Sequence, residues 1–355
     1  MSSKANDRKI ELSSLIFPKN YRPTLKGIAT EKALGKLNGF IESNLESKMN
    51  LSRVNAPLFV QKGTGINDNL NGIEEPVSFA AQATDHMEAE VVQSLAKWKR
   101  MLLKKYEIAP GEGIYTDMRA IRPHEQLDNL HSLYVDQWDW ELCINKENRN
   151  LAYLKDKVRT LYSILKGAAA YLYKEYGIPQ DLPDEITFVH TEELVRDYPK
   201  YTPEEREWES VKKHGAIFLI GIGGVLSDGL PQDGRSPDYD DWSSPNEDGY
   251  FGLNGDILVW NTVLERPFEL SSMGIRVDKQ ALLRQLELTH QLGRKDLLFH
   301  KQLLADELPL SLGGGIGKSR VGMFFLKKAH IGEVSFGLWP ENMVQRFAEH
   351  QIELL

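Results

Sequence analysis

Residues 132–142, SLYVDQWDWEL, decide how the fold is interpreted. In an extended strand, successive side chains point to opposite faces, so Gln137, Asp139 and Glu141 share one face while Trp138 and Trp140 occupy the other. Burying unpaired charge is expensive, so a face with an amide and two carboxylates either meets solvent or lines a polar site. The tryptophans indicate that the opposite face is the core, which favours the polar site.

The neighbouring segments extend this strand into a sheet. Residues 113–122 have strand character, and the polar loop 123–130 joins them to the first stretch, which predicts an antiparallel pair. Strands joined to their neighbours by short loops indicate an α+β fold: an antiparallel β-sheet flanked by helices. The pattern predicts helices at 30–48, 88–106, 150–176 and within 278–305, and strands at 54–60, 113–122, 132–142, 216–222, 256–260, 268–277 and 333–339.

The chain divides into an arm and one large unit. Residues 1–25 are polar, contain Pro18 and Pro23, and are expected to form an N-terminal arm. Residues 26–355 contain no repeat or clear linker, so we expect a single domain there. Glycines predict turns at 63–65 and 71–72, on either side of Asp68, and a long acidic loop spans 227–252.

Composition excludes several classes of protein. The net charge of -8 and a pI near 5.7 disfavour a broad nucleic-acid surface, which needs lysine and arginine. The lone cysteine, Cys143, cannot form an internal disulfide and is expected to be a structural thiol. Neither an apolar stretch of membrane length nor an apolar signal region near the start is present, so we expect a cytoplasmic protein. The histidines show no zinc-binding spacing.

A glycine cluster at residues 313–317 precedes Lys318-Ser319 and invites comparison with a phosphate-binding P-loop. A P-loop needs a glycine five residues before Gly317, but position 312 is leucine. We expect the cluster to open a final apolar helix through Leu326, with Arg320 just inside the helix start. Arg320 could then bind phosphate there, or the glycines could be a helix cap beside an exposed arginine; the residues alone leave both interpretations open.

These motifs together resemble a known family. Residues 122–125 and the following strand resemble the second signature motif of class II aminoacyl-tRNA synthetases, and residues 315–320 resemble the third. Longer runs, from about residue 28 to the end, are similar to the AMP-forming aspartate–ammonia ligase (asparagine synthetase A) family. They are 68–70, 94–100, 134–140, 237–242, 252–261 and 269–278. The arm looks longer than the bacterial pattern, and the role of His124 in the loop of the second motif is open.

The resemblance implies an activity and its cofactors. It implies a synthetase-like catalytic core, working as a homodimer without nucleic acid or membrane, that uses ATP and Mg²⁺. L-Aspartate would be converted to β-aspartyl-AMP and then amidated by ammonia to L-asparagine, with release of AMP and pyrophosphate. One alternative is a catalytically silent paralogue that binds an amino acid or adenylate as a regulatory module. An aspartyl- or asparaginyl-tRNA synthetase is a third option, disfavoured by the acidic pI.

The resemblance also implies roles for individual residues around ATP. Arg122 would bridge the α-phosphate and the reacting carboxylate, and Arg320 would hold the distal phosphates or the adenine, because a guanidinium forks onto two oxygens. Asp240 is expected to contact ATP. Asp256 and Glu269 would bind magnesium, which prefers oxygen ligands, although two solvated strand carboxylates would give the same pattern.

Aspartate and ammonia would use a second group of residues. Lys99 and Arg276 suit the carboxylate that is not activated, and Asp139, Ser271 and Ser272 suit the ammonium or nearby polar atoms. Asp68 would bind ammonium and remove its proton, because ammonium itself is not nucleophilic. Gln137 would stabilise the oxyanion or the carboxamide.

Overall fold

A computed structural model describes residues 15–68, 74–179 and 181–355. The turn expected at 71–72 and the first 14 residues of the expected arm lie outside the described residues. The helices are α1 (Ile28–Met49), α2 (Ala96–Lys105), α3 (Leu151–Tyr176), α4 (Thr191–Asp197), α5 (Pro203–His214), α6 (Lys279–Leu288), α7 (Leu298–Leu304), α8 (Lys318–Phe325) and α9 (Glu341–Glu349). The strands are β1 (Leu51–Arg53), β2 (Phe59–Gln61), β3 (Ser78–Ala81), β4 (Met87–Val91), β5 (Gly113–Ile121), β6 (Tyr134–Cys143), β7 (Thr187–His190), β8 (Ala216–Ile220), β9 (Asn254–Asn261), β10 (Arg266–Ile275) and β11 (Ser311–Gly317).

Eight strands form one sheet in the order β1-β5-β6-β11-β10-β9-β8-β7. The six inner strands, β5-β6-β11-β10-β9-β8, each pair antiparallel with their inner neighbours. This pairing confirms the expected α+β architecture. The two edge strands differ from the expectation, because β1 and β7 pair parallel with their neighbours. The third and fourth strands in this order, β6 and β11, lie at the centre and carry the polar face.

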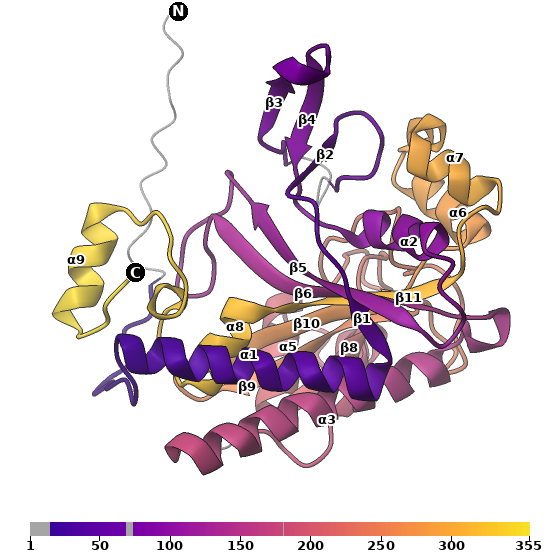
Figure 1. Ribbon diagram of the computed structural model, residues 1–355. Coiled ribbons are helices and arrows are strands. Elements are labelled where there is room, and N and C mark those ends of the chain that lie inside the picture. The colour runs from indigo at the N-terminus through magenta and orange to yellow at the C-terminus, as the bar shows by residue number, and fades with distance from the viewer. Residues whose placement is uncertain (1–14, 69–73, 180) are drawn as a thin grey trace, which may run out of the picture.

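Long helices cover one face of the sheet. In Figure 1, α1 and α3 lie side by side along one side of the sheet, and α1 packs on α3. Trp138 and Trp140 of β6 point into this layer and are fully buried, as expected. Helix α3 begins where the Asn150 side chain accepts a hydrogen bond from the backbone of Tyr153 and ends at Gly177 in a left-handed conformation.

Shorter helices cover the opposite face. Helix α2 packs on β5, β6 and β11, and α5 packs on β8, β9 and β10. The start of α5 is a capping box between Thr202 and Glu205, with Pro203 in the first turn. A smaller sheet, in the order β2-β4-β3, projects away from the main sheet (Figure 1).

Several expected elements differ from the structure. The strand expected at 54–60 is wrong over residues 54–58, which link β1 to β2, whereas residues 59 and 60 begin β2. The helix expected at 88–106 is two elements, β4 and α2, and the strand expected at 333–339 is a 3₁₀ turn (Ile331–Glu333) followed by irregular chain. The sequence interpretation also omitted β7, α4, α5 and α9.

The glycine cluster is the most informative difference. Residues 311–317 form the central strand β11 rather than a loop that opens a helix, although α8 does begin directly after Gly317. Strand propensity of glycine is poor. Here the pairing is imposed from both sides, because β6 and β10 each form a ladder with β11.

The described part of the arm contacts the body of the protein. Asn129 exchanges hydrogen bonds with the backbone of Ile16 through both of its amide atoms, each at 2.9 Å. The hydroxyl of Tyr21 donates to Glu333, and Lys328 donates to the carbonyl of Leu25 at 2.7 Å. Residues 15–25 are therefore attached to the region around α8.

Candidate active site

A cavity of about 390 Å³ opens on the face of β6, β11 and β10 that α1 and α3 do not cover. This volume is in the range of small-molecule sites. The cavity confirms that the polar face of β6 lines a site. It brings together ten of the residues expected from the sequence: Asp68, Lys99, Arg122, Gln137, Asp139, Asp240, Glu269, Ser272, Arg276 and Arg320.

Backbone without side chains forms the floor of this cavity. Gly315 stands directly opposite Asp139, and a Cβ added to it would lie 2.8 Å from Asp139 Oδ1 and closer still to Gln137 Oε1. A Cβ at Gly313 would lie 2.5 Å from Arg276 Nη2 and closer to the Glu141 carboxylate. The glycines therefore leave the space that these polar side chains occupy.

A buried ionic network holds one side of the cavity. Arg276 lies within hydrogen-bonding distance of both Glu141 carboxylate oxygens, with Nη2 2.9 Å from Oε2, and also forms an ion pair with Asp240. Asp240, expected to contact ATP, is thus held by the arginine expected to contact aspartate. Lys99 Nζ donates to the carbonyls of Trp140 and Gly314 at 3.0 and 3.2 Å.

Lys99 and Glu141 are charged groups without solvent. Burial lowers the pKa of Lys99, partly offset by Asp139, whose carboxylate lies 3.4 Å away. For Glu141, burial raises the pKa, but Arg276 and Lys99 together outweigh it and the net pKa is lowered. Both groups are therefore held in a fixed, paired geometry. Within it, Lys99 presents its positive charge towards Asp139.

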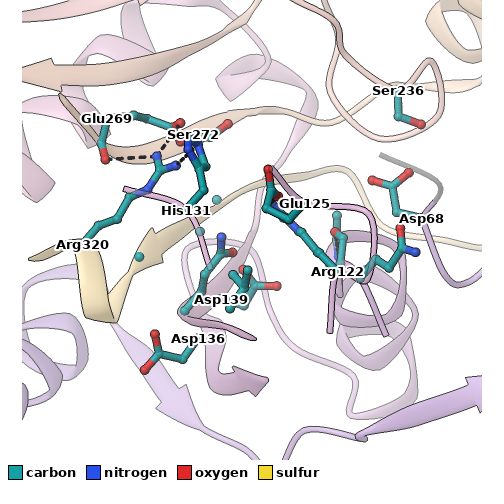
Figure 2. A pocket seen from close by; sticks show the side chains of 18 of the residues that line it. Asp68, Arg122, Glu125, His131, Asp136, Asp139, Ser236, Glu269, Ser272 and Arg320 are labelled. Carbon is teal, nitrogen blue, oxygen red and sulfur yellow. Dashed lines mark hydrogen bonds and ion pairs between the residues drawn. The ribbon is translucent and has the colours of Figure 1, made fainter. Parts of the chain in front are cut away.

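Arg320 and Arg122 approach the cavity from different elements. Arg320, in the first turn of α8, donates to Glu269 at 3.0 Å and lies 3.0 Å from His131 Nε2. Arg122 follows β5; its Nη1 is 3.8 Å from Glu125, and its buried Nε has no hydrogen-bond partner among the described residues. Figure 2 shows the group of Arg320, Glu269 and His131 at one side and Asp68 at the other.

The two expected magnesium ligands occupy neighbouring strands but are engaged differently. Asp256 does not line the cavity directly, because Arg235 covers it with Nη2 at 2.7 and 2.9 Å from the two carboxylate oxygens. Burial, together with the charge of Glu269, raises the pKa of Asp256 to about 7 against the lowering effect of Arg235.

This donor set fits magnesium when phosphate is present. Among the residues described, no cluster of three His, Cys, Asp or Glu side chains could hold a metal alone. Magnesium commonly binds through one or two carboxylates together with substrate phosphates, and a divalent cation would relieve the repulsion between Asp256 and Glu269.

Asp68 is buried, and in the described part of the chain neither of its carboxylate oxygens accepts a hydrogen bond within 3.5 Å. Burial raises its pKa, opposed by the ammonium of Lys97. Lys97 is itself paired at 3.0 Å with Asp238, which also binds Arg294 and His300, each at 2.9 Å. The neighbouring charges are thus already paired, and Asp68 has no direct hydrogen-bond partner among residues 15–68, 74–179 and 181–355.

Ser271 does not reach the cavity, which corrects its expected role. A β-bulge lies between Glu269 and Ser271 of β10, so the alternation of side chains shifts by one residue. Ser271 pairs with Ile257 and Ile316 on the core side, and its hydroxyl donates to the Gly315 carbonyl at 2.9 Å. Ser272 faces the cavity instead.

The sequence interpretation missed several residues that line this site, among them Arg235, His131 and Gln93. Arg235 lies in the acidic loop 227–252, and a lone arginine just before Pro237-Asp238-Tyr239-Asp240-Asp241 was the available signal. His131, whose Nδ1 is 2.9 Å from Asp128, holds Arg320 from the loop of the second motif.

Cys143 is buried among apolar residues, in keeping with a structural thiol, and burial raises its pKa. In the part of the chain that the structure describes, every helix is too short or too polar to cross a membrane.

Comparison with known proteins shows the family of this chain. The family model described as Aspartate-ammonia ligase matches residues 28–351. Proteins named aspartate–ammonia ligase from Bacteroides fragilis and Clostridium perfringens are 53% and 50% identical over 345 residues, covering 97% of this chain and all of each relative.

Solved structures agree on the fold. Asparaginyl-tRNA synthetases in complex with asparaginyl-adenylate, from Entamoeba histolytica and Pyrococcus horikoshii, superpose with TM-scores of 0.59 and 0.63 at 14% and 15% identity. The matches cover 86% and 88% of this chain, which spans 66% and 70% of the length of those synthetase chains. The fold is thus that of a class II aminoacyl-tRNA synthetase core, and the chain belongs to the aspartate–ammonia ligase family.

Proposed function

We propose that this protein makes L-asparagine from L-aspartate, ATP and ammonia through a β-aspartyl-AMP intermediate, releasing AMP and pyrophosphate. One observation carries the proposal. A single cavity holds an arginine–carboxylate pair at Arg320 and Glu269. It also holds the buried Nε of Arg122 and the buried carboxylate of Asp68, neither of which has a hydrogen-bond partner among the residues that the structure describes.

The first half-reaction converts a poor electrophile into a reactive one. A carboxylate repels nucleophiles, whereas its mixed anhydride with AMP carries a good leaving group. Arg122 would bind the α-phosphate and the aspartate β-carboxylate together and stabilise the charge that develops between them. Arg320 would bind the distal phosphates or the adenine on the other side of the cavity.

Recognition of aspartate would use the buried ionic network. Lys99 and Arg276 supply positive charge for the carboxylate that does not react, and Asp139 and Ser272 supply acceptors for the ammonium group. Glu141 and Asp240 fix the guanidinium of Arg276 before substrate arrives. Such prior positioning reduces the entropy lost when substrate binds.

Asp256 and Glu269 would hold magnesium together with phosphate oxygens of ATP. When bound, the ion would neutralise the negative charge that builds on the leaving pyrophosphate. Asp256 would have to share its oxygens with Arg235 or release them, so Arg235 would adjust when ATP binds.

The second half-reaction needs a neutral nucleophile. Asp68 would accept one proton from ammonium, and the resulting ammonia would attack the acyl carbon. The bond between that carbon and the phosphate oxygen breaks, AMP leaves with the electron pair, and the nitrogen loses a second proton to solvent. Gln137 would hold the acyl oxygen or the new carboxamide during this step.

A homodimer, a cytoplasmic location and a magnesium requirement are parts of the same proposal. They follow from the resemblance to the family. Light scattering of the purified protein would test the dimer, for which we expect about twice the monomer mass of 40.4 kDa.

The activity itself is tested with ATP, Mg²⁺, aspartate and ammonium in the absence of tRNA. Equal amounts of AMP and asparagine are expected. Binding of aspartate and ATP without any AMP would instead support the silent paralogue, which none of the comparisons favours and which the intact Arg122, Gln137 and Arg320 argue against.

A further inference from the structure

Gln93 is a fully buried side chain that forms no hydrogen bond with the described residues. It lies between β4 and α2, is 0% exposed and lines the cavity. Both Oε1 and Nε2 lack a partner among the described residues. An unsatisfied buried amide is costly to the fold, and native proteins leave few of them. Gln93 therefore indicates a polar ligand that donates a hydrogen bond to its amide oxygen.

Asn67 holds Gln93 beside Asp68. The Asn67 Oδ1 atom accepts two backbone hydrogen bonds, from Asp68 at 3.0 Å and from Gln93 at 2.9 Å. Its Nδ2 donates to the carbonyl of Val91 at 3.1 Å, which fixes the amide orientation. The backbone N–H groups of Asp68 and Gln93 thus donate to the same Asn67 oxygen. Each of these two residues also carries side-chain oxygens that accept no hydrogen bond from the described residues.

The free acceptors define the chemistry of the ligand. An ammonium ion has four N–H donors and no acceptor, so it suits a carboxylate and an amide oxygen together. The two nearby lysines are already engaged, because Lys97 is paired with Asp238 and Lys99 with Asp139 and two carbonyls. Arg122 also lines this cavity, but its proposed role is to bind the α-phosphate. We propose that Gln93 Oε1 and the Asp68 carboxylate together form the ammonium-binding subsite of this enzyme.

This inference rests on the proposed ammonia step and adds a residue to it. Gln93 binds the ion and orients it, while Asp68 removes its proton. Ammonium affinity therefore depends on the acceptor at position 93, whereas formation of β-aspartyl-AMP, which needs no ammonium, does not.

The test compares Gln93→Met with the wild type. Methionine has a similar length and no strong hydrogen-bonding atom, so the KM for ammonium is expected to rise at least tenfold, or about 1.4 kcal/mol. Aspartate-dependent exchange of pyrophosphate into ATP should change less than threefold. The Tm should not fall, because the substitution removes an unsatisfied buried group. Gln93→Glu keeps acceptor oxygens and should retain the KM for ammonium within threefold.

Gln285→Met is the matched control for stability. Gln285 is also 0% exposed, but its amide bonds Pro237, Asp240, Trp242 and Ser243, so its loss should lower the Tm. An unchanged KM for ammonium in Gln93→Met, an equal loss of exchange, or a loss in Gln93→Glu as large as in Gln93→Met overturns the inference. A wild-type protein that forms no asparagine from ammonium contradicts the proposed function instead.

Discussion

Replacing Gly315 by alanine is expected to disable the enzyme without unfolding it. The added methyl group would lie 2.8 Å from Asp139 Oδ1, where ordinary contacts begin near 3.4 Å, so that carboxylate must move by about 0.6 Å. Gln137 Oε1 lies closer and must move by about 1 Å. Both atoms end flexible side chains, so the fold can absorb the movement while the site cannot.

The size of the effect follows from the displacement. A misplacement of about 1 Å in a catalytic or positioning group costs on the order of 100-fold in rate, or about 2.7 kcal/mol of transition-state stabilisation. Stability should change by less than about 1 kcal/mol, because alanine also restricts the unfolded chain. Gly315 has no positive φ, so its backbone tolerates a side chain.

Two measurements check this prediction. The rate of asparagine formation is compared with the free energy of unfolding from urea titration. The control is Gly39→Ala in α1, where a Cβ meets no atom within 4 Å, and it should raise stability slightly with full activity. A folded Gly315→Ala protein within threefold of wild-type kcat/KM would refute the placement of substrate over Gln137 and Asp139.

Further predictions concern single groups. Arg122→Ala should lower aspartate-dependent pyrophosphate exchange at least about 100-fold, and near-normal exchange would contradict its contact with the reacting phosphate. Asp68→Asn should retain exchange but lose asparagine formation; an equal loss of both would exclude a specific role in the ammonia step. His330 is buried, and burial lowers its pKa from 6.5 to about 4. Its contribution to stability is therefore complete above pH 6.5 and lost as the pH falls towards 4, up to about 3 kcal/mol. Unfolding titrations at pH 7 and 4.5 should show a smaller decrease for His330→Asn; the same decrease would assign the acid sensitivity to other groups.

Local sequence patterns were sufficient to predict the helices and strands whose ends and faces are set by neighbouring residues. The helix from Leu151 to Tyr176 is bounded by an asparagine cap and a glycine, and β6 alternates visibly between tryptophans and carboxylates. The start of helix α5 was also predictable, because Thr202-Pro203-Glu204-Glu205 has the sequence of a capping box.

The remaining features depend on tertiary contacts. Nothing local marks Gly313–Gly317 as strand, because glycine contributes no packing and the pairing comes from β6 and β10. The bulge in β10 decides that Ser272 and not Ser271 faces the cavity, and a bulge of this kind has no clear sequence signal. Arg235 belongs to a loop whose path to Asp256 is set by the whole fold.

Helix α2 carries three cations that are each at most 2% exposed, Lys97, Lys99 and Arg100. Their partners come from much later in the chain: Asp238 for Lys97, Gly314 for Lys99, and the carbonyls of Val277 and Pro309 for Arg100. During synthesis the ribosome releases α2 long before these partners exist. Lys97 can pair only after residue 238 is made, and Arg100 and Lys99 gain their last partners when residues 309 and 314 emerge, so the site is completed only near the end of translation. Although N-terminal segments commonly fold first, here the last strand of the sheet to be made is the one that completes the cavity.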